Sequence, residues 1–197
     1  MKPLLVLGPL LSGSAGIAQE RVPDEEAKKI AAALVKAADK AKAPLKVEAD
    51  ADTPFAKRKD KRGALVMAVK GLEAKTIADA RAEIVPVGQL WLKELSPVID
   101  NRPASAKKLL ILPVTHNDDE VNLVLCSLGV QTVKDRLSLV VLGKEKTPLL
   151  TLPLEKIDQK QDKPIEFNVT IEDDQATLSV TLLGKYRAPV RVGLLED

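Results

Sequence analysis

The chain has 197 residues, of which 45% are hydrophobic and 29% are charged, and its formal net charge is +2. This composition is typical of a folded protein with a buried core and excludes an intrinsically disordered chain. A net charge so close to zero gives no reason to expect nucleic acid or a membrane surface as a partner. Because only 2% of the residues are aromatic, the core has to be built from Leu, Val, Ile and Ala.

The first 18 residues, MKPLLVLGPLLSGSAGIA, have the features of a signal peptide. Lys2 supplies a positive charge, residues 4–11 form a short apolar run, and Gly16 and Ala18 are the small residues that a signal peptidase requires. The apolar run is much shorter than the roughly 20 residues that span a bilayer as a helix. We therefore expect export with cleavage after Ala18, and no transmembrane span in the mature chain.

The cysteine content bears on the compartment. The chain contains one cysteine, Cys126, and therefore forms no disulfide within itself. Secreted eukaryotic domains more often carry paired cysteines, and no cysteine stands after Ala18 to carry a lipid anchor. The sequence therefore favours a periplasmic or secreted protein of bacterial type.

Residues 24–42, DEEAKKIAAALVKAADKAK, are predicted to form an amphipathic helix that ends before Pro44. Most helices of this length bury their apolar face in their own core, so we expect this one to pack on the rest of the protein. The alternative is an arm that projects and binds a partner. The apolar stripe, at the spacing of one helix face, consists of Ala27, Ile30, Ala31, Leu34, Val35 and Ala38.

From residue 45 onward the apolar pattern changes to a period of two, which indicates β-strands. Pro113 and Pro153 lie inside two of these segments and predict edge strands or bulges there. Residues 71–84 do not alternate and are compatible with a short helix. The predicted strands are residues 45–50, 64–70, 86–95, 107–114, 120–128, 136–143, 148–154, 165–172, 176–184 and 189–195.

Short strands at regular spacing, without a second long helix, predict a mainly β protein. The expected fold is an antiparallel β-sandwich of about eight to ten strands, preceded by one N-terminal amphipathic α-helix. A parallel βαβ sheet is disfavoured. The expected organisation is a signal peptide at residues 1–18, a helical segment at residues 19–44 and a β-sandwich domain at residues 45–197.

One internal similarity refines this prediction. LSLVVLGKEKTPLLTLPLE from Leu137 aligns without gaps with LSVTLLGKYRAPVRVGLLE from Leu178. Each segment reads as a strand, a Gly-Lys turn and a second strand that follows a proline, and the turn glycine allows a positive φ. We expect two equivalent hairpins, one in each sheet of the sandwich. The alternative is that two unrelated hairpins share the same turn chemistry.

The segment VTHNDDEVN, residues 114–122, contains the chain's single histidine, His116. A zinc site needs about three protein ligands at regular spacing, and HExxH and CxxC patterns are absent from the sequence. Cys126 lies in a strand with apolar residues on both faces, so it is expected to be a buried hydrophobic residue. We therefore interpret residues 114–122 as a hairpin connection and assign no catalytic residue.

Calcium remains open as a cofactor because it needs only oxygen ligands. Residues 116–120 and 172–174 form two acidic turns that could lie at one end of a sandwich. The EF-hand spacing is absent, and Asp and Asn are also common in ordinary turns. The candidate calcium ligands are Asp118, Asp119, Glu120, Asp173 and Asp174.

The segment KRKDKR, residues 57–62, is the strongest concentration of charge. It could bind a phosphate group or an anionic polymer of the cell envelope; alternatively it is a solvated hairpin loop between two predicted strands. Nucleic acid is disfavoured as its ligand because aromatic residues for base stacking are scarce, with only Trp91 and Tyr186 as candidates. The candidate anion-binding residues are Lys57, Arg58, Lys59, Lys61 and Arg62.

Taken together, these patterns favour an exported, non-enzymatic protein with a binding or structural role in the cell envelope. Its partner would be an unknown protein or another envelope component. The alternative is a hydrolase, or a calcium-dependent binding protein, that uses the acidic turns at residues 116–120 and 172–174.

Overall fold

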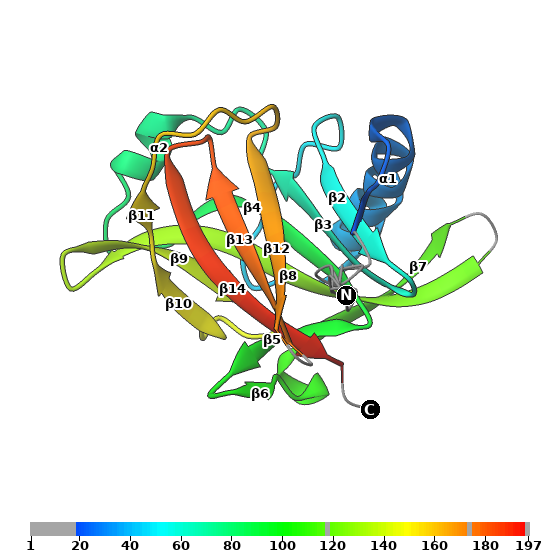
Figure 1. The fold of residues 1–197 in the computed structure, drawn as a ribbon. Coiled ribbons are helices and arrows are strands. Elements are labelled where there is room, and N and C mark those ends of the chain that lie inside the picture. Colours follow the sequence, from blue (N-terminus) through cyan, green and yellow to red (C-terminus); the bar gives the residue numbers. More distant parts are fainter. Residues whose placement is uncertain (1–18, 117–118, 173–174, 196–197) are drawn as a thin grey trace, which may run out of the picture.

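The computed structural model describes residues 19–116, 119–172 and 175–195. The protein is mainly β, with 52% of its residues in strands, and its two antiparallel sheets pack face to face like a sandwich (Figure 1). One long helix lies near the N-terminal end of the described chain, between the first two strands. The predicted fold class is therefore confirmed. No helix in these three ranges is both long enough and apolar enough to cross a membrane.

The first sheet has the strand order β1-β2-β3-β4-β8-β9-β10, and β7 pairs with residues 119–125, the N-terminal half of β8. The 15-residue strand β8 is long enough to pair with β4, β7 and β9 along its length. The strands of this sheet are β1 (Glu20–Arg21), β2 (Phe55–Lys59), β3 (Arg62–Ala68), β4 (Val85–Lys93), β7 (Leu110–His116), β8 (Asp119–Val133), β9 (Arg136–Leu142) and β10 (Leu150–Pro153).

The second sheet has the strand order β12-β13-β14-β5-β6, and β11 pairs with β14. The chain passes from the first sheet to the second at Glu94, whose positive φ of 57° turns the backbone between β4 and β5. The strands of this sheet are β5 (Leu95–Ile99), β6 (Arg102–Pro103), β11 (Glu155–Lys156), β12 (Ile165–Glu172), β13 (Gln175–Leu182) and β14 (Tyr186–Leu194).

The main hydrophobic core lies between the two sheets. Alternate residues of β8, among them Val124, Cys126 and Leu128, face residues of the second sheet such as Leu178 and Val180. The predicted burial of Cys126 is therefore confirmed. Because β8 is apolar on its other face as well, it also contributes to a second core.

The second core lies between the first sheet and the long helix α1 (Asp24–Lys40), so the helix packs on the sheet as expected. Ala27, Ala31 and Leu34 of the helix are buried against the sheet, where Trp91 and Leu125 belong to the same cluster. Small alanine side chains let the helix approach the strands closely. The protein therefore has three layers: one helix, the first sheet and the second sheet.

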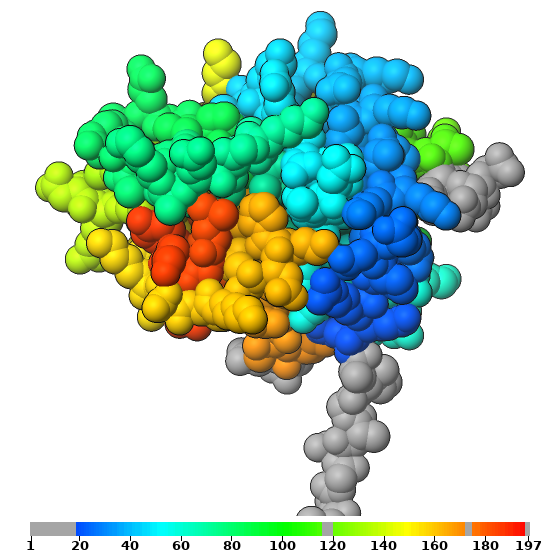
Figure 2. Space-filling view, turned by 90° about the horizontal axis from the view of Figure 1, so that it is seen from above, coloured from blue at the N-terminus to red at the C-terminus, as the bar shows by residue number. Residues whose placement is uncertain are grey.

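The start of α1 is also tied to the second sheet. The Nζ atom of Lys163, just before β12, donates to Asp24 Oδ2 at 2.7 Å. In the space-filling view, the blue segment that contains α1 accordingly adjoins the orange segment that leads into β12 (Figure 2). This contact fixes the helix at the side of the sandwich where β2 and β12 approach each other.

Several details differ from the sequence prediction. Residues 45–50 form no strand and contribute only a single bridge between Ala49 and Val69. The strand that pairs with β3 is β2, which begins ten residues later than the predicted partner. The described strands also outnumber the predicted eight to ten, because three have only two residues and the segment 86–99 is divided between the sheets. The remaining short elements are the helix α2 (Ala74–Ala78) and the 3₁₀ turn η1 (Ala106–Lys108).

The two similar segments form hairpins in different sheets, as predicted: β9–β10 in the first and β13–β14 in the second. Their turns are not equivalent. Gly184 has a φ of +65°, as expected for a tight turn. Gly143 has no positive φ, but a Cβ atom there would lie 2.3 Å from the backbone oxygen of Lys108. Both positions need glycine, for different physical reasons.

Pro113 and Pro153, the two prolines for which edge strands or bulges were predicted, lie in edge strands. Among the described strands, β7, which contains Pro113, pairs with β8 alone, and β10, which contains Pro153, pairs with β9 alone. A residue without a backbone N–H is tolerated at an edge because only one side of the strand needs hydrogen bonds.

Candidate functional site

The basic segment at residues 57–62 is the closed end of the β2–β3 hairpin. Lys59 pairs with Arg62, and the turn between them is formed by Asp60, with a φ of 53°, and Lys61. The segment therefore contributes to both strands and is more than the solvated loop considered from the sequence. This matters because a strand directs alternate side chains to opposite faces of its sheet.

Alternation sorts the cations of the hairpin into two groups. Phe55 and Ala64 of this hairpin belong to the core between the sheets, whereas Ala56 belongs to the core under α1. Lys57 and Lys59 follow Phe55 at intervals of two residues, and Arg62 precedes Ala64 by two, so these cations face the second sheet. They are here called the basic triad. Of the five predicted anion-binding residues, the structure thus brings three together on one face.

Arg58 borders the same region, but its charge is balanced. Its guanidinium lies 2.6 Å from a carboxylate oxygen of Glu26 on α1 and 3.3 Å from one of Glu20 on β1. The hydrogen bonds that Arg58 donates to Glu20 first, and then to Glu26, raise the pKa of Arg58 above its usual value. Arg58 therefore holds the helix to the hairpin. The fifth predicted residue, Lys61, occupies the turn and is exposed.

Opposite the basic triad, the second sheet presents an apolar surface. Phe167, Val169 and Ile171 follow one another on the inner face of β12, and Leu178 joins them from β13; these four residues are here called the apolar wall. Ile171 is 46% exposed and is one of the two large hydrophobic residues that are exposed in the described part of the chain. The other, Leu194, pairs with Leu95 at the same end of the sandwich.

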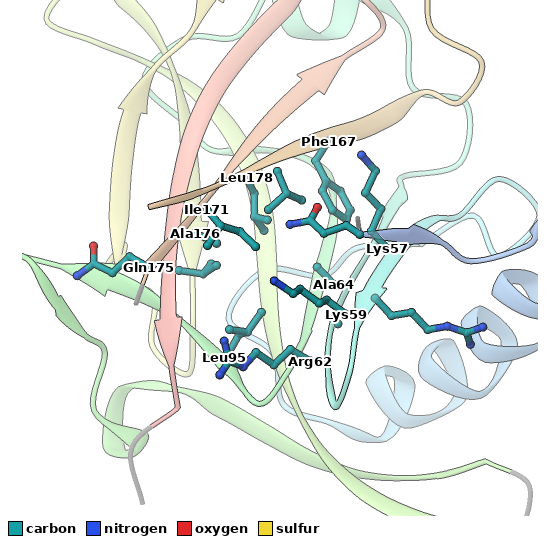
Figure 3. Close-up of a pocket in the computed structure, with 15 residues that line it drawn as sticks. Lys57, Lys59, Arg62, Ala64, Leu95, Phe167, Ile171, Gln175, Ala176 and Leu178 are labelled. Atoms are coloured by element: carbon teal, nitrogen blue, oxygen red, sulfur yellow. The ribbon is translucent and has the colours of Figure 1, made fainter. Parts of the chain in front are cut away.

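The basic triad and the apolar wall enclose a cleft, here called the basic cleft, at the open end of the sandwich. Figure 3 shows Lys57 beside Phe167, Lys59 extending toward Ile171, and Arg62 next to Leu95. The volume of the cleft is about 70 Å³. One water molecule needs roughly 10–15 Å³ on this scale, so the cleft has room for about five to seven waters or a small ligand.

Lys57 is the most enclosed cation of the triad. Its Nζ atom lies 5.8 Å from the centroid of the Phe55 ring, and the guanidinium carbon of Arg21 lies 5.2 Å from the same centroid. Burial, and then the positive charge of Arg21, lower the pKa of Lys57, while the Glu166 carboxylate acts in the opposite direction. The site therefore holds positive charge at some energetic cost, which a bound anion would reduce.

The nearest polar groups do not neutralise the triad. Lys57 Nζ lies 3.4 Å from the amide oxygen of Asn168. The Glu166 carboxylate accepts hydrogen bonds from the backbone amides of Asp162 and Lys163. Among the ion pairs between described side chains, none includes a member of the basic triad. The cleft thus combines three cations with an apolar surface.

A second cavity, the helix–sheet groove, lies on the opposite face of the first sheet. It is bounded by α1 and the sheet, has a volume of about 300 Å³, and is lined by apolar residues that include Ile30, Leu65 and Trp91. Its lining carries five basic residues, among them Lys57 and Arg62 of the basic triad, against two acidic residues, Glu26 and Asp60. The groove therefore also favours an anion over a cation, and it shares part of its basic lining with the basic cleft.

The acidic turns are only partly described. His116 pairs with Asp119 at the end of the β7–β8 hairpin, as the predicted hairpin connection requires, and Glu120 is exposed. Asp118, Asp173 and Asp174 lie outside the described residues, as do the side chains of His116 and Asp119. Among the described residues, no group of three His, Cys, Asp or Glu side chains could hold a metal ion. The calcium site therefore stays a prediction.

Cys126 can be assigned more firmly. Its side chain has no exposed surface, and burial raises the pKa of its thiol to about 12. A thiol with such a pKa is neutral at physiological pH and is neither a nucleophile nor a metal ligand.

The apolar wall was not predicted as part of a site. Its strands were identified from their alternating pattern, but nothing in that pattern distinguishes these positions from any other inward-facing residues. Their position opposite the basic hairpin depends on how two segments more than 100 residues apart are packed.

No known protein family, curated protein or solved structure matches the chain. The basic cleft is accordingly the feature from which a function can be inferred.

Proposed function

We propose that this protein is an exported, non-enzymatic binding protein that binds an anionic ligand in the basic cleft. The observation that carries the proposal is the placement of Lys57, Lys59 and Arg62 on one face of a hairpin, without a carboxylate partner among the described ion pairs. Arg58, on the other face, shows how the same hairpin neutralises a cation that has a structural role.

Electrostatics favour an anion at this position. Three like charges near one another repel, and the repulsion is strengthened where an apolar surface excludes water. Burial, and then the nearby charge of Arg21, lower the pKa of Lys57, so holding this ammonium group next to the apolar surface already has a cost. An anion that contacts all three side chains would replace the repulsion by charge-assisted hydrogen bonds.

The composition of the cleft supports binding over catalysis. In the described part of the chain, its lining contains no Asp, Glu, His, Ser or Cys. General acid–base or nucleophilic catalysis uses such side chains within hydrogen-bond distance of each other. Apart from its lysines, the described lining of the cleft therefore offers recognition groups and none of the groups that commonly act in such catalysis.

The proposed export rests on the sequence of the first 18 residues. The first described strand, β1, begins at Glu20, so cleavage after Ala18 would leave every described element in place. Because Gln19 lines the cleft, cleavage would also place a new α-amino group there.

Mass spectrometry of the protein exported by a bacterium that expresses the whole chain tests the proposed cleavage. The expected mass begins at Gln19, and an uncleaved chain retained in the cytoplasm would contradict it.

Binding is tested by thermal unfolding of residues 19–197 with inorganic phosphate, citrate or acetate at constant ionic strength. A ligand present at 100 times its Kd stabilises the native state by about 2.7 kcal/mol, which raises the Tm by several degrees. We expect this increase for the unmodified protein and its loss at high NaCl concentration.

The test needs two variants with equal charge. Lys57→Gln, Lys59→Gln and Arg62→Gln together remove the basic triad. The matched control removes three exposed lysines from α1 that form no ion pair with another described side chain, Lys29, Lys36 and Lys40. The proposal requires that anions stabilise the control and not the triad variant. Equal stabilisation of both variants would show a general salt effect and overturn the proposal.

A further inference from the structure

The two walls of the basic cleft differ in chemistry. On the first sheet, the inward positions of β2 change from Phe55 to Lys57 and Lys59 toward the open end. On the second sheet, the inward positions of β12 stay apolar from Phe167 to Ile171. A ligand that is only an anion would satisfy the first wall and leave the outer part of the second wall, Val169 and Ile171, in contact with water, since Phe167 and Leu178 are already buried.

The apolar wall is also incompletely covered by the protein itself. Ile171 and Leu194, the two exposed large hydrophobic residues of the described chain, both belong to β-strands at this end of the second sheet. Exposed apolar surface next to a cleft is a common feature of binding sites. The ligand that fits the cleft therefore has an apolar part that covers this surface.

The lysine side chains suit a ligand of this kind. A lysine has a long apolar stem that can lie along a hydrocarbon chain while its ammonium group reaches the polar end. The planar guanidinium of Arg62 can form two parallel hydrogen bonds with one carboxylate. The triad thus provides both contacts to a chain and a site for its charged end.

From this arrangement we infer that the ligand is a single-chain anionic amphiphile, a fatty acid, whose carboxylate binds the basic triad and whose chain lies on the apolar wall. This inference rests on the proposed anion-binding function and specifies its ligand. The ligand binds as a free monomer, because Phe167 and Leu178 of the wall are buried between the two sheets and only its outer end, at Ile171, is strongly exposed. The cleft volume of about 70 Å³ accommodates a short part of the chain, and the remainder extends along the exposed residues.

Calorimetric titration of residues 19–197 with straight-chain carboxylates tests the inference. The series is acetate, hexanoate, octanoate and decanoate, each below its micelle concentration, with decanol as an uncharged comparison. Each added methylene is expected to increase the affinity by about twofold to fourfold, because full burial of a methylene corresponds to about fourfold. Decanol is expected to bind at least about tenfold more weakly than decanoate, and acetate, which has eight fewer methylenes, at least about 250-fold more weakly.

Single substitutions test the contribution of each wall to binding separately. Ile171→Gln is expected to remove most of the dependence on chain length and to leave the salt-sensitive binding of phosphate unchanged. Lys59→Gln is expected to weaken the binding of phosphate and also the binding of the straight-chain carboxylates. The matched control is Ile157→Gln, which changes a partly exposed isoleucine outside the lining of the cleft and is expected to change neither.

The outcomes distinguish the inference from the proposed function. Salt-sensitive binding of phosphate without any dependence on chain length would overturn the inference and leave the proposed function standing. If neither phosphate nor the straight-chain carboxylates bind, both the inference and the proposed function are overturned. Binding to vesicles of anionic phospholipid, with no binding of monomeric carboxylates, would contradict the monomeric ligand.

The fluorescence of Trp91 locates the bound chain. This single tryptophan lines the helix–sheet groove on the opposite face of the sheet from the cleft. Binding in the cleft is expected to leave its emission unchanged. A change in emission that Ile30→Gln abolishes would place the ligand in the groove instead and overturn the inference, since Ile30 lines the groove and not the cleft.

Discussion

The rings of Phe55 and Phe167 meet edge to face, with centroids 5.2 Å apart and an interplanar angle of 86°. Phe55 is on the first sheet and Phe167 on the second, so this contact joins the two layers. It also marks the boundary between the buried core and the basic cleft, because the next inward residue of β2 is Lys57. The packing of the cleft therefore depends on this aromatic pair.

The pair is expected to be energetically coupled. Replacing either ring with leucine loses the edge-to-face contact, and aromatic pairs of this geometry contribute about 0.5–1.5 kcal/mol beyond the area they bury. Urea unfolding of Phe55→Leu, Phe167→Leu and the double variant gives the coupling free energy. Additive effects of the two substitutions would contradict the predicted contact.

Two glycines with almost the same backbone conformation should respond differently to substitution. Gly71 has a φ of +68° and no atom within 4 Å of an added Cβ, whereas Gly184 has a φ of +65° and the backbone oxygen of Gln159 at 1.9 Å. Gly71→Ala is expected to cost about 1 kcal/mol from the positive φ alone. Gly184→Ala must also displace the loop at Gln159 and is expected to cost about 3 kcal/mol or more. Urea unfolding measures both, and equal effects would contradict the prediction.

The pH dependence of stability should reveal the ion pair of Asp24. The hydrogen bond from Lys163 is the main cause that lowers the pKa of Asp24 below its usual value of 3.8. A carboxylate with a lowered pKa in the folded state stabilises the protein above its unfolded pKa, and this stabilisation is lost as the pH falls through the lowered pKa. The difference in unfolding free energy between the unmodified protein and Asp24→Asn is therefore expected to shrink as the pH is reduced from 6 toward 3.

Asp39→Asn is the matched control, because Asp39 lies on the same helix and outside the ion pairs of the described side chains. Urea unfolding at several pH values provides the measurement. A difference between the unmodified protein and Asp24→Asn that stays constant across this range would show that the Lys163 contact does not depend on the charge of Asp24.

The sequence predicted the fold class well, because most of the fold is encoded in local periodicity. The alternating residues of β8 and the alanine stripe of α1 each identified the correct element and its buried faces. The prediction was wrong at β2. Its alternation is hidden because Lys57 and Lys59 stand at inward positions, which sequence patterns expect to be apolar. A functional site that breaks the hydrophobic pattern is therefore the kind of feature that local patterns miss.

Only the basic part of the candidate site could be predicted from the sequence. The five cations of residues 57–62 were visible as a cluster, but their division between two faces follows from the register in which Lys59 pairs with Arg62. The apolar wall could not be assigned to a site because its role depends on long-range packing against β2 and β3. Charge composition is visible in a sequence, whereas the surface that a charge faces is a property of the tertiary structure.

The acidic segment at residues 172–174 offers a final prediction about the cleft. Ile171 and Gln175, which flank this segment in the sequence, both line the cleft. Because this segment is joined in the chain to both of these lining residues, we expect its negative charges to repel an incoming carboxylate, since the Debye length at physiological ionic strength is about 8 Å. Replacing Glu172, Asp173 and Asp174 together with Gln, Asn and Asn is therefore expected to increase the affinity for decanoate by about threefold at low salt. The matched change of Asp118, Asp119 and Glu120 at the β7–β8 hairpin should leave the affinity unchanged.

Repeating both titrations with calcium tests the predicted metal site, since calcium bound at residues 172–174 would increase the affinity of the unmodified protein and not that of the neutralised variant. A decrease in affinity on neutralisation would show that these side chains support the cleft instead of opposing its ligand.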